Sequence, residues 1–248
     1  MNQELQQFLL AAQFLTRIPV GRWITFRAEN LPQSAKYFPL IGALIGAASA
    51  LVFAACARTL PGSLAILFSM LATVLLTGAL HEDGLADTAD GLGGSTRERA
   101  LEIMRDSRLG TFGAVALWFS LTLKFALLQW LDTRGFPLWR VLAATPLLSR
   151  CAAVALLATC ENARASSATS GAFTGKVSLE TLGISVAYTL LLSALLLRQS
   201  AFSCALAVFF SVVLLRRLFL QRLGGITGDC LGAAIQISEL AVLFALSA

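Results

Sequence analysis

Seven long runs of apolar residues constrain the fold of this chain more than any other feature. Short polar segments separate the runs, which cover residues 38–57, 62–80, 111–131, 137–159, 180–197, 200–220 and 231–247. A helix needs about 20 predominantly apolar residues to cross the hydrocarbon core of a bilayer, and most of the runs reach or approach that length. The sequence therefore predicts an all-α, polytopic membrane bundle of about seven transmembrane helices. Residues 1–248 are expected to form a single integral membrane domain.

The composition excludes an ordinary soluble domain. Charged residues make up 13% of the chain and hydrophobic residues 57%, whereas about a quarter of a typical soluble domain is charged. The net charge of +5 could suggest nucleic acid in a soluble protein. Basic and aromatic residues are not interleaved here, so we expect the lipid bilayer as a partner and no nucleic acid.

Residues 2–17 precede the first run and are expected to form an amphipathic helix. Leu5, Phe8, Leu9 and Leu15 recur at helical spacing among glutamines and a glutamate. The segment is too short and too polar to span a bilayer. It is expected to lie in the membrane interface or to pack under the bundle.

The distribution of basic residues predicts the orientation of the chain. If the N-terminus is inside and the C-terminus outside, the inner segments carry 13 lysines and arginines and the outer loops four. Basic residues collect in cytoplasmic loops, so this N-in, C-out arrangement is favoured. It places the polar segments 81–110, 160–179 and 221–230 together on the cytoplasmic side.

The acidic segment that follows the second run is the strongest candidate for chemistry. Asp83, Asp87 and Asp90 are spaced i, i+4, i+7 and would share one face of a helix. Three unpaired carboxylates on one face repel each other unless a cation lies between them. Oxygen ligands of this kind suit Mg²⁺, which often shares its coordination with substrate phosphates, so a pyrophosphate substrate would fit. Gly84 and Gly91 would let a bulky ligand approach the backbone.

Two other interpretations of the acidic segment stay open on this evidence. It could be a solvated loop whose charges have no function, or an ion-transport site, because carboxylates within membranes often mark one. His81, the only histidine, could be a general base, a metal ligand or a hydrogen-bond partner of Asp83, or it could simply cap the end of the second run. Glu82 would point to a different helix face and could be a further metal ligand. Ser95 and Glu98 form a capping box that predicts a helix to about Ser107.

Two other segments could bind phosphates. Arg105 and Arg108 precede the N-terminus of the third run, where helix amides favour anions. Thr227, Gly228 and Asp229 open the last run and could form an anion-binding nest or contact a metal. Arg105 and Arg108 could equally do no more than fix the orientation of the chain in the membrane, and the glycine-rich segment before the last run could be a flexible turn. Inside the spans, Lys124 and Arg150 could snorkel or pair with a buried carboxylate; Arg150 lies near enough to the inner end to reach the site.

The acidic segment, read from His81 to Gly94 as HEDGLADTADGLGG, resembles the signature of the cobalamin synthase family, the adenosylcobinamide-GDP ribazoletransferases. Three other segments are similar to the same family, in the expected order: Phe14–Val20, Tyr37–Gly42 and Met104–Thr111. The glycine-rich stretch from Gly224 to Asp229 also matches in character.

The resemblance implies a multi-pass enzyme of the bacterial inner membrane, with its active site facing the cytoplasm and Mg²⁺ as cofactor. It would join adenosylcobinamide-GDP to α-ribazole or its 5′-phosphate and release GMP. In this interpretation Asp83, Asp87, Asp90 and Glu82 would serve the metal. Asp83, Asp87 and His81 would be the catalytic residues, and Arg105, Arg108, Thr227, Gly228 and Asp229 would bind the substrate.

Alternatives to this family and the oligomeric state stay open. A CDP-alcohol phosphotransferase also uses spaced aspartates, but its pattern places Ala-Arg after Asp-Gly, whereas Ala86 is followed here by Asp87. A cation transporter is a further alternative, although the carboxylates cluster at the end of a span. Gly42, Gly46 and Ala50 are spaced for close helix packing, within one protomer or between the protomers of a homo-oligomer.

Overall fold

The computed structural model describes residues 2–24, 30–164 and 176–248, and this part of the chain is helical. Its one pairing outside helices is a single parallel bridge between Asn162 and Ile226. The predicted all-α class is confirmed. Short 3₁₀ turns cover Gly21–Trp23, Ala35–Tyr37 and Arg198–Ser200. The α-helices are α1 (Gln3–Leu15), α2 (Asn30–Ser34), α3 (Phe38–Cys56), α4 (Gly62–Thr77), α5 (Leu80–Leu92), α6 (Arg97–Ile103), α7 (Thr111–Thr133), α8 (Leu138–Thr159), α9 (Leu179–Leu197), α10 (Ala201–Leu223) and α11 (Gly228–Ser247).

Each predicted apolar run coincides with one helix, α3, α4, α7, α8, α9, α10 or α11. By length and composition, five described stretches could cross a membrane, or six if α4 and α5, which meet at a bend of 84°, count as one. One of the five, Leu179–Leu223, is 45 residues long and contains both α9 and α10, which are separated by the 3₁₀ turn that begins at Arg198 (φ 53°). A polytopic membrane protein is therefore confirmed, and the number seven stays a prediction.

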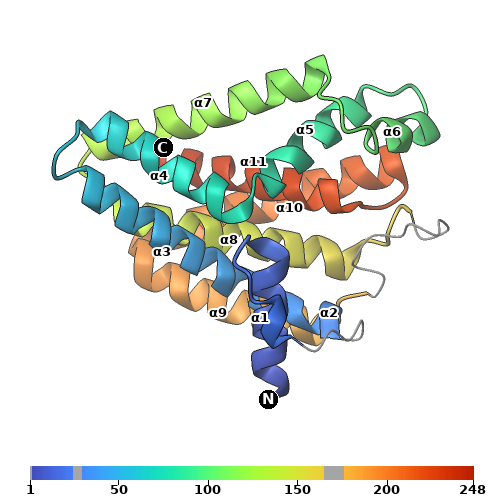
Figure 1. Ribbon diagram of the computed structural model, residues 1–248, viewed down its shortest axis with the longest axis horizontal. Coiled ribbons are helices and arrows are strands. Elements are labelled where there is room, and N and C mark those ends of the chain that lie inside the picture. Colours follow the sequence, from blue (N-terminus) through green and yellow to red (C-terminus); the bar gives the residue numbers. More distant parts are fainter. Residues whose placement is uncertain (1, 25–29, 165–175) are drawn as a thin grey trace.

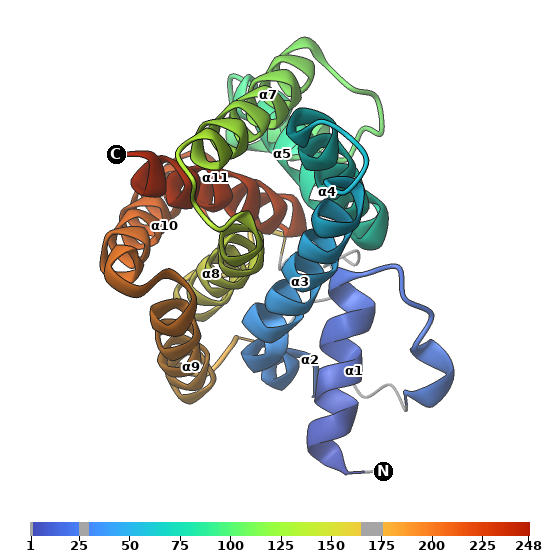
Figure 2. The ribbon, with the colours of Figure 1, turned by 90° about the vertical axis from the view of Figure 1, so that its left-hand side faces the viewer.

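Helix α8 forms the centre of the bundle, and the other long helices surround it (Figure 2). In α8, 89% of the most apolar window is buried inside the protein, against 17% in α7. The outer helices expose large apolar side chains, among them Trp118 and Phe119 on α7 and Phe202 and Phe209 on α10. These outer faces are apolar and suit contact with the lipid of a bilayer.

The closest helix contact joins α3 to α8 through glycines. A Cβ atom added at Gly46 would lie 2.2 Å from the Leu142 carbonyl oxygen, and one at Gly42 would lie 2.3 Å from that of Pro146. Pro146 has no N–H, so the Leu142 carbonyl lacks its partner within α8 and is left for the Gly46 backbone to contact. The small-residue stripe is thus used within one protomer.

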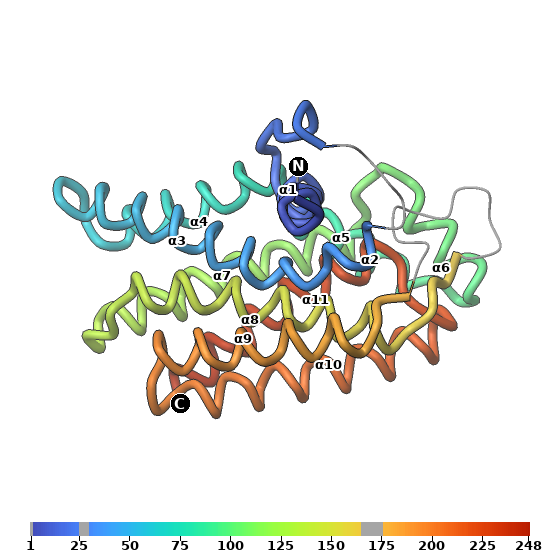
Figure 3. The backbone as a smooth tube through the Cα atoms, turned by 90° about the horizontal axis from the view of Figure 1, so that it is seen from below, coloured from blue at the N-terminus to red at the C-terminus, as the bar shows by residue number. Residues whose placement is uncertain are grey.

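Helix α1 crosses the direction of the other long helices, and Figure 3 shows it end-on. Its apolar side, with Leu10, Ala11 and Leu15, is buried. Its polar side contacts the segment before α3, where Glu4 pairs with Lys36 at 2.7 Å. The predicted amphipathic helix therefore exists and packs against the bundle.

One end of the bundle gathers the polar segments (Figure 1). Arg97 at the start of α6 donates to the Ala163 carbonyl after α8 (3.2 Å), and Arg222 on α10 donates to the carbonyls of Leu92 and Gly94 after α5 (both 2.9 Å). The segments assigned to one side by charge counting thus lie together, while the C-terminus lies at the opposite end. Part of the 160–179 segment, residues 165–175, lies outside the described residues.

Candidate active site

The acidic segment that follows α4 is the regular helix α5, as the spacing of its aspartates predicted, and not the solvated loop that was left open as an alternative. Gly78 (φ 65°) and Ala79 (φ 58°) both adopt the left-handed conformation, which ends α4 and turns the chain before α5 begins. Glycine accepts this conformation readily, whereas alanine accepts it at a cost, so the bend depends on its surroundings. As a helix, α5 does place Asp83, Asp87 and Asp90 along one side, as their spacing predicted.

The glycines of the acidic motif face protein and not an open ligand space. A Cβ atom at Gly84 would lie 2.8 Å from the Asp229 carbonyl oxygen on α11, and one at Gly91 would lie 2.3 Å from Met104 Cγ. The expectation that these glycines admit a ligand is therefore wrong. Gly84 instead lets α5 pack directly on α11, where Gly232 approaches the backbone of His81 in return.

The three aspartates differ in their surroundings. Asp83 is exposed, while Asp87 and Asp90 are partly buried. Both Asp90 carboxylate oxygens accept backbone hydrogen bonds from the start of α7: from Gly110 N–H at 2.8 Å and from Gly113 N–H at 2.9 Å. Asp90 therefore caps α7. Such bonds satisfy the free amides at the start of a helix, and the negative charge is stabilised by the positive end of the helix dipole.

Asp229 on α11 lies opposite the aspartates of α5. Its carboxylate accepts from Arg164 at 3.3 Å and from the Thr227 hydroxyl at 3.2 Å. Thr227 also caps α11 by accepting from Cys230 N–H at 3.3 Å. The negative charges of Asp83, Asp229 and Asp90 all act on Asp87, and Arg164 offsets them only in part. Two segments that are far apart in sequence thus form one acidic region.

This region suits Mg²⁺ in its chemistry, but its ligands are not assembled. The side chains supply oxygen donors, and Mg²⁺ commonly takes one or two carboxylates together with water and substrate phosphates. In the described part of the chain, no three acidic, histidine or cysteine side chains stand close enough together to hold a metal ion. The assignment of Asp83, Asp87, Asp90 and Glu82 as ligands stays a prediction.

The predicted arginines lie on an open surface beside α5. Arg108 pairs with Asp106 at 2.6 Å, and this guanidinium lowers the pKa of Asp106 to about 2. Arg108 and Asp90 both line an open hollow of about 590 Å³ between α6 and the start of α7. Arg105 is also exposed. The preceding helix is shorter than expected, ending at Ile103, and Thr96 caps it in place of Ser95.

His81 and Glu82 face the interior of the bundle, where they are 2% and 8% exposed. Arg150 Nη2 lies 3.4 Å from His81 Nδ1. A guanidinium only donates, so Nδ1 is the acceptor and the proton of a neutral imidazole lies on Nε2. Glu82 accepts from Gln236 Nε2 at 2.9 Å.

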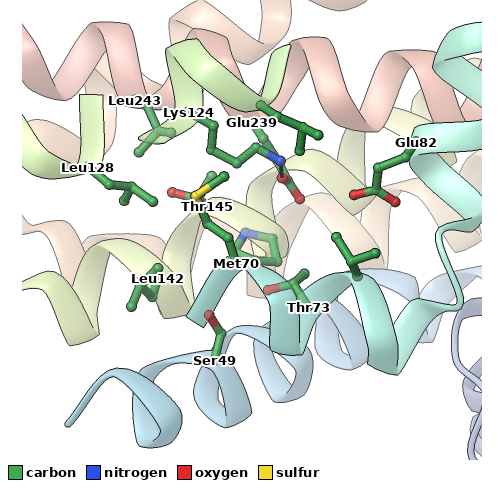
Figure 4. Close-up of a pocket in the computed structure, with 13 residues that line it drawn as sticks. Ser49, Met70, Thr73, Glu82, Lys124, Leu128, Leu142, Thr145, Glu239 and Leu243 are labelled. Carbon is green, nitrogen blue, oxygen red and sulfur yellow. Dashed lines mark hydrogen bonds and ion pairs between the residues drawn. The ribbon is translucent and has the colours of Figure 1, made fainter. Parts of the chain in front are cut away.

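A small cavity of about 40 Å³ lies beside these residues, and Glu82, Lys124 and Glu239 point into it (Figure 4). Lys124 pairs with Glu239 at 2.6 Å, and Arg150 also pairs with Glu239. The expectation that Lys124 or Arg150 could pair with a buried carboxylate is confirmed. Glu239 and Gln236 were not predicted from the sequence, although a glutamate within an apolar span is a visible signal.

Comparisons with known proteins identify the family. A model of the cobalamin-5-phosphate synthase family matches residues 7–247. The chain belongs to this family. It is 44% identical to adenosylcobinamide-GDP ribazoletransferase of Leptothrix cholodnii over 96% of this chain and 93% of that protein. It is 41% identical to the protein of the same name from Ralstonia nicotianae, over 100% of this chain and 97% of that one. No solved structure matches.

Membership of the cobalamin-5-phosphate synthase family confirms the resemblance noted in the acidic motif, and with it an enzyme, a transferase of cobalamin synthesis. The match runs from within α1 to the end of α11, so it includes the apolar helices as well as the acidic segment. It also removes the support for a cation transporter.

Proposed function

We propose that this chain transfers the adenosylcobinamide-phosphate group from adenosylcobinamide-GDP to α-ribazole or its 5′-phosphate, releasing GMP. The observation that carries the proposal is the family match over residues 7–247. The acidic region between α5 and the start of α11 supports it, because carboxylates beside an open surface suit metal-assisted phosphoryl transfer. In the reaction a ribose hydroxyl forms a bond to phosphorus, the pyrophosphate P–O bond breaks, and GMP leaves.

Asp83 and Asp87 are the proposed ligands of Mg²⁺, with Asp229 opposite them. When bound, the metal would neutralise charge on the pyrophosphate oxygens. We leave Asp90 and Glu82 out of this set, because Asp90 already caps α7 and Glu82 faces the bundle interior.

An aspartate of α5 is the proposed acceptor of the hydroxyl proton. His81 is unsuited to this role, because its ring is buried and its Nδ1 faces Arg150. An acceptor must reach the substrate hydroxyl, and Asp83 is the exposed carboxylate of the motif.

The leaving GMP phosphate is proposed to lie near Arg105 and Arg108, beside the hollow between α6 and α7. Gly228 and Asp229 would approach the substrate from the start of α11, whereas Thr227, also predicted to bind it, is 4% exposed and caps that helix. A Cβ atom at Gly228 would meet nothing within 4 Å, so this glycine, unlike Gly84, does border open space. We further propose that the polar end of the bundle faces the cytoplasm across a bacterial inner membrane.

The test is product formation by the purified, detergent-solubilised protein with adenosylcobinamide-GDP, α-ribazole 5′-phosphate and Mg²⁺. We expect GMP release with formation of a new cobamide. EDTA and Asp87→Ala should each abolish turnover. Turnover that persists in EDTA would overturn the metal assignment. No turnover by the lipid-supplied, monodisperse protein would overturn the reaction and direct attention to nucleotide-alcohol transfer.

A further inference from the structure

We propose that Glu239 on α11 is a positioning residue that fixes the rotation of α5 about its own axis, and hence the direction in which Asp83 and Asp87 face. The inference deepens the proposed function and rests on it. Glu239 is 4% exposed and lies inside the bundle, where it touches neither the acidic region nor its open surface. Its effect reaches α5 through two chains of side chains.

The first chain runs through Arg150. One guanidinium nitrogen, Nη1, donates to Glu239 Oε1, and the other, Nη2, lies 3.4 Å from His81 Nδ1 at the start of α5. Arg150 is fully buried, and Ser149 accepts a second bond from Nη1 at 2.9 Å. The planar guanidinium thus holds a carboxylate on α11 and an imidazole on α5 in a fixed relation.

The second chain runs through Lys124 and Gln236. Lys124 Nζ donates to Glu239 Oε2 at 2.6 Å and to Gln236 Oε1 at 2.8 Å. Because the ammonium holds the amide oxygen, the amide nitrogen of Gln236 is turned toward Glu82, to which it donates at 2.9 Å. Both carboxylate oxygens of Glu239 are therefore used, and each leads to a different residue of α5.

The two end points are adjacent in α5, which makes the pair effective against rotation. Successive residues of an α-helix project about 100° apart, so His81 and Glu82 hold α5 at two different angles. The next residue, Asp83, then faces the remaining, exposed side. The glycine contact between Gly84 and α11 sets how closely the helices approach, but without a side chain it gives little resistance to turning.

The charges of this network balance, which allows it to lie within an apolar bundle. Lys124 and Arg150 both pair with Glu239, while Glu82 accepts from the neutral amide of Gln236, so the formal charges of the four residues sum to zero. A buried charge is tolerated when it is paired and hydrogen-bonded, so Lys124, Arg150 and Glu239 depend on one another. Removing the Glu239 carboxylate alone would leave Lys124 and Arg150 without their shared anionic partner. Both series of side chains that lead to α5 would then lose the residue they have in common.

The first experiment compares kcat and KM of Glu239→Gln with those of the parent enzyme. We expect kcat to fall by about 10- to 100-fold, because misplacing catalytic groups by about 1 Å can cost that much, and KM to change by less than about threefold. Glu239→Asp, which keeps the charge, should recover a large part of kcat. If Glu239→Gln does not fold, Glu239→Gln with Lys124→Met restores charge balance and should fold while kcat stays low.

The matched control is Ser238→Ala on the same helix. Ser238 is fully buried and hydrogen-bonds Ser211 on α10 at 3.0 Å, so its loss removes an interhelix bond that does not lead to α5. We expect its kcat to match the parent. An equal loss of kcat in Ser238→Ala and Glu239→Gln would overturn the proposal, because it would indicate general loosening of α11.

The second experiment follows α5 without measuring turnover, so it separates this inference from the proposed reaction. Cysteines are introduced singly as Asp83→Cys (exposed) or Ala86→Cys (3% exposed), after the half-buried Cys56 and Cys151 are replaced by alanine. Maleimide should label the first site fast and the second slowly. Adding Glu239→Gln should slow labelling of the first and speed that of the second. Unchanged labelling at both sites would overturn the proposal, whatever the enzyme assay gives.

Discussion

At the scale of the residue, four carboxylates that look equivalent in the acidic motif have different surroundings. Asp83 is exposed, Asp87 lies in the field of three other aspartates, Asp90 is bonded to two backbone amides, and Glu82 is held inside the bundle. Glu82 differs because it projects from another side of the helix, and the three aspartates differ because they meet different neighbours along one side. Substitutions should therefore separate carboxylates that serve chemistry from those that serve structure.

Asp83→Asn tests the chemical role. We expect turnover to fall below detection, because the neutral amide removes a proposed metal ligand, while the free energy of unfolding changes by less than about 0.5 kcal/mol, as is usual at exposed positions. Activity assays and thermal unfolding in detergent would measure both. Full activity in this variant would contradict the assignment of Asp83.

Asp90→Ala tests the structural role. Loss of a helix cap costs about 0.5–2 kcal/mol, so we expect a lower unfolding temperature and reduced, but measurable, turnover. Asp90→Asn keeps one acceptor oxygen and should fall between the parent and the alanine variant. If Asp90→Ala were as stable as the parent yet inactive, the carboxylate would be a ligand and not a cap.

At the scale of the element, the contact between α5 and α11 is made by backbone. Gly84→Ala would place a methyl group 2.8 Å from the Asp229 carbonyl oxygen, so the helices must separate. Overpacking of this kind costs about 1–3 kcal/mol, and we expect a comparable loss of stability together with reduced turnover.

Gly183→Ala in α9 is the matched control for this contact. A Cβ atom at Gly183 meets nothing within 4 Å, and alanine is the better helix former by about 1 kcal/mol. We expect this variant to be active and as stable as the parent or slightly more so. Similar unfolding temperatures for the two alanine variants would show that the α5–α11 contact can relax, contrary to this expectation.

The elements also mark the limit of what one sequence could predict. Apolar runs and the i, i+4, i+7 aspartates are local patterns, and the helices carrying them were found where expected. The pairing of Arg150 with Glu239, 89 residues apart, has no local signature. The motif of α5 is rich in glycine and aspartate, which are poor helix formers, so its composition alone favours a loop. Packing on α11 overrides that preference. The same packing fills the space beside Gly84 where a bulky ligand was expected to approach the backbone.

At the scale of the whole molecule, the orientation in the membrane can be tested with two single cysteines, one on α6 and one at the C-terminal end of α7. Glu102→Cys lies at the polar end of the bundle, and Thr133→Cys lies at the other end; both positions are exposed. In the background without Cys56 and Cys151, a membrane-impermeant maleimide added to intact spheroplasts should label only Thr133→Cys. Inverted vesicles should give the opposite result. The reverse pattern would contradict the N-in, C-out orientation.

The arginines that predict this orientation also close the polar end of the bundle. Arg97 bonds the Ala163 carbonyl, Arg216 bonds that of Thr159, and Arg222 bonds those of Leu92 and Gly94. During insertion, the same side chains would keep their segments from being translocated. The same arginines therefore act twice. During insertion they oppose translocation of their segments, and in the folded protein they donate hydrogen bonds to backbone carbonyls. A substitution that removes one of these arginines would weaken the topology signal and also remove a hydrogen bond between helix ends, so errors of topology and errors of assembly should occur together.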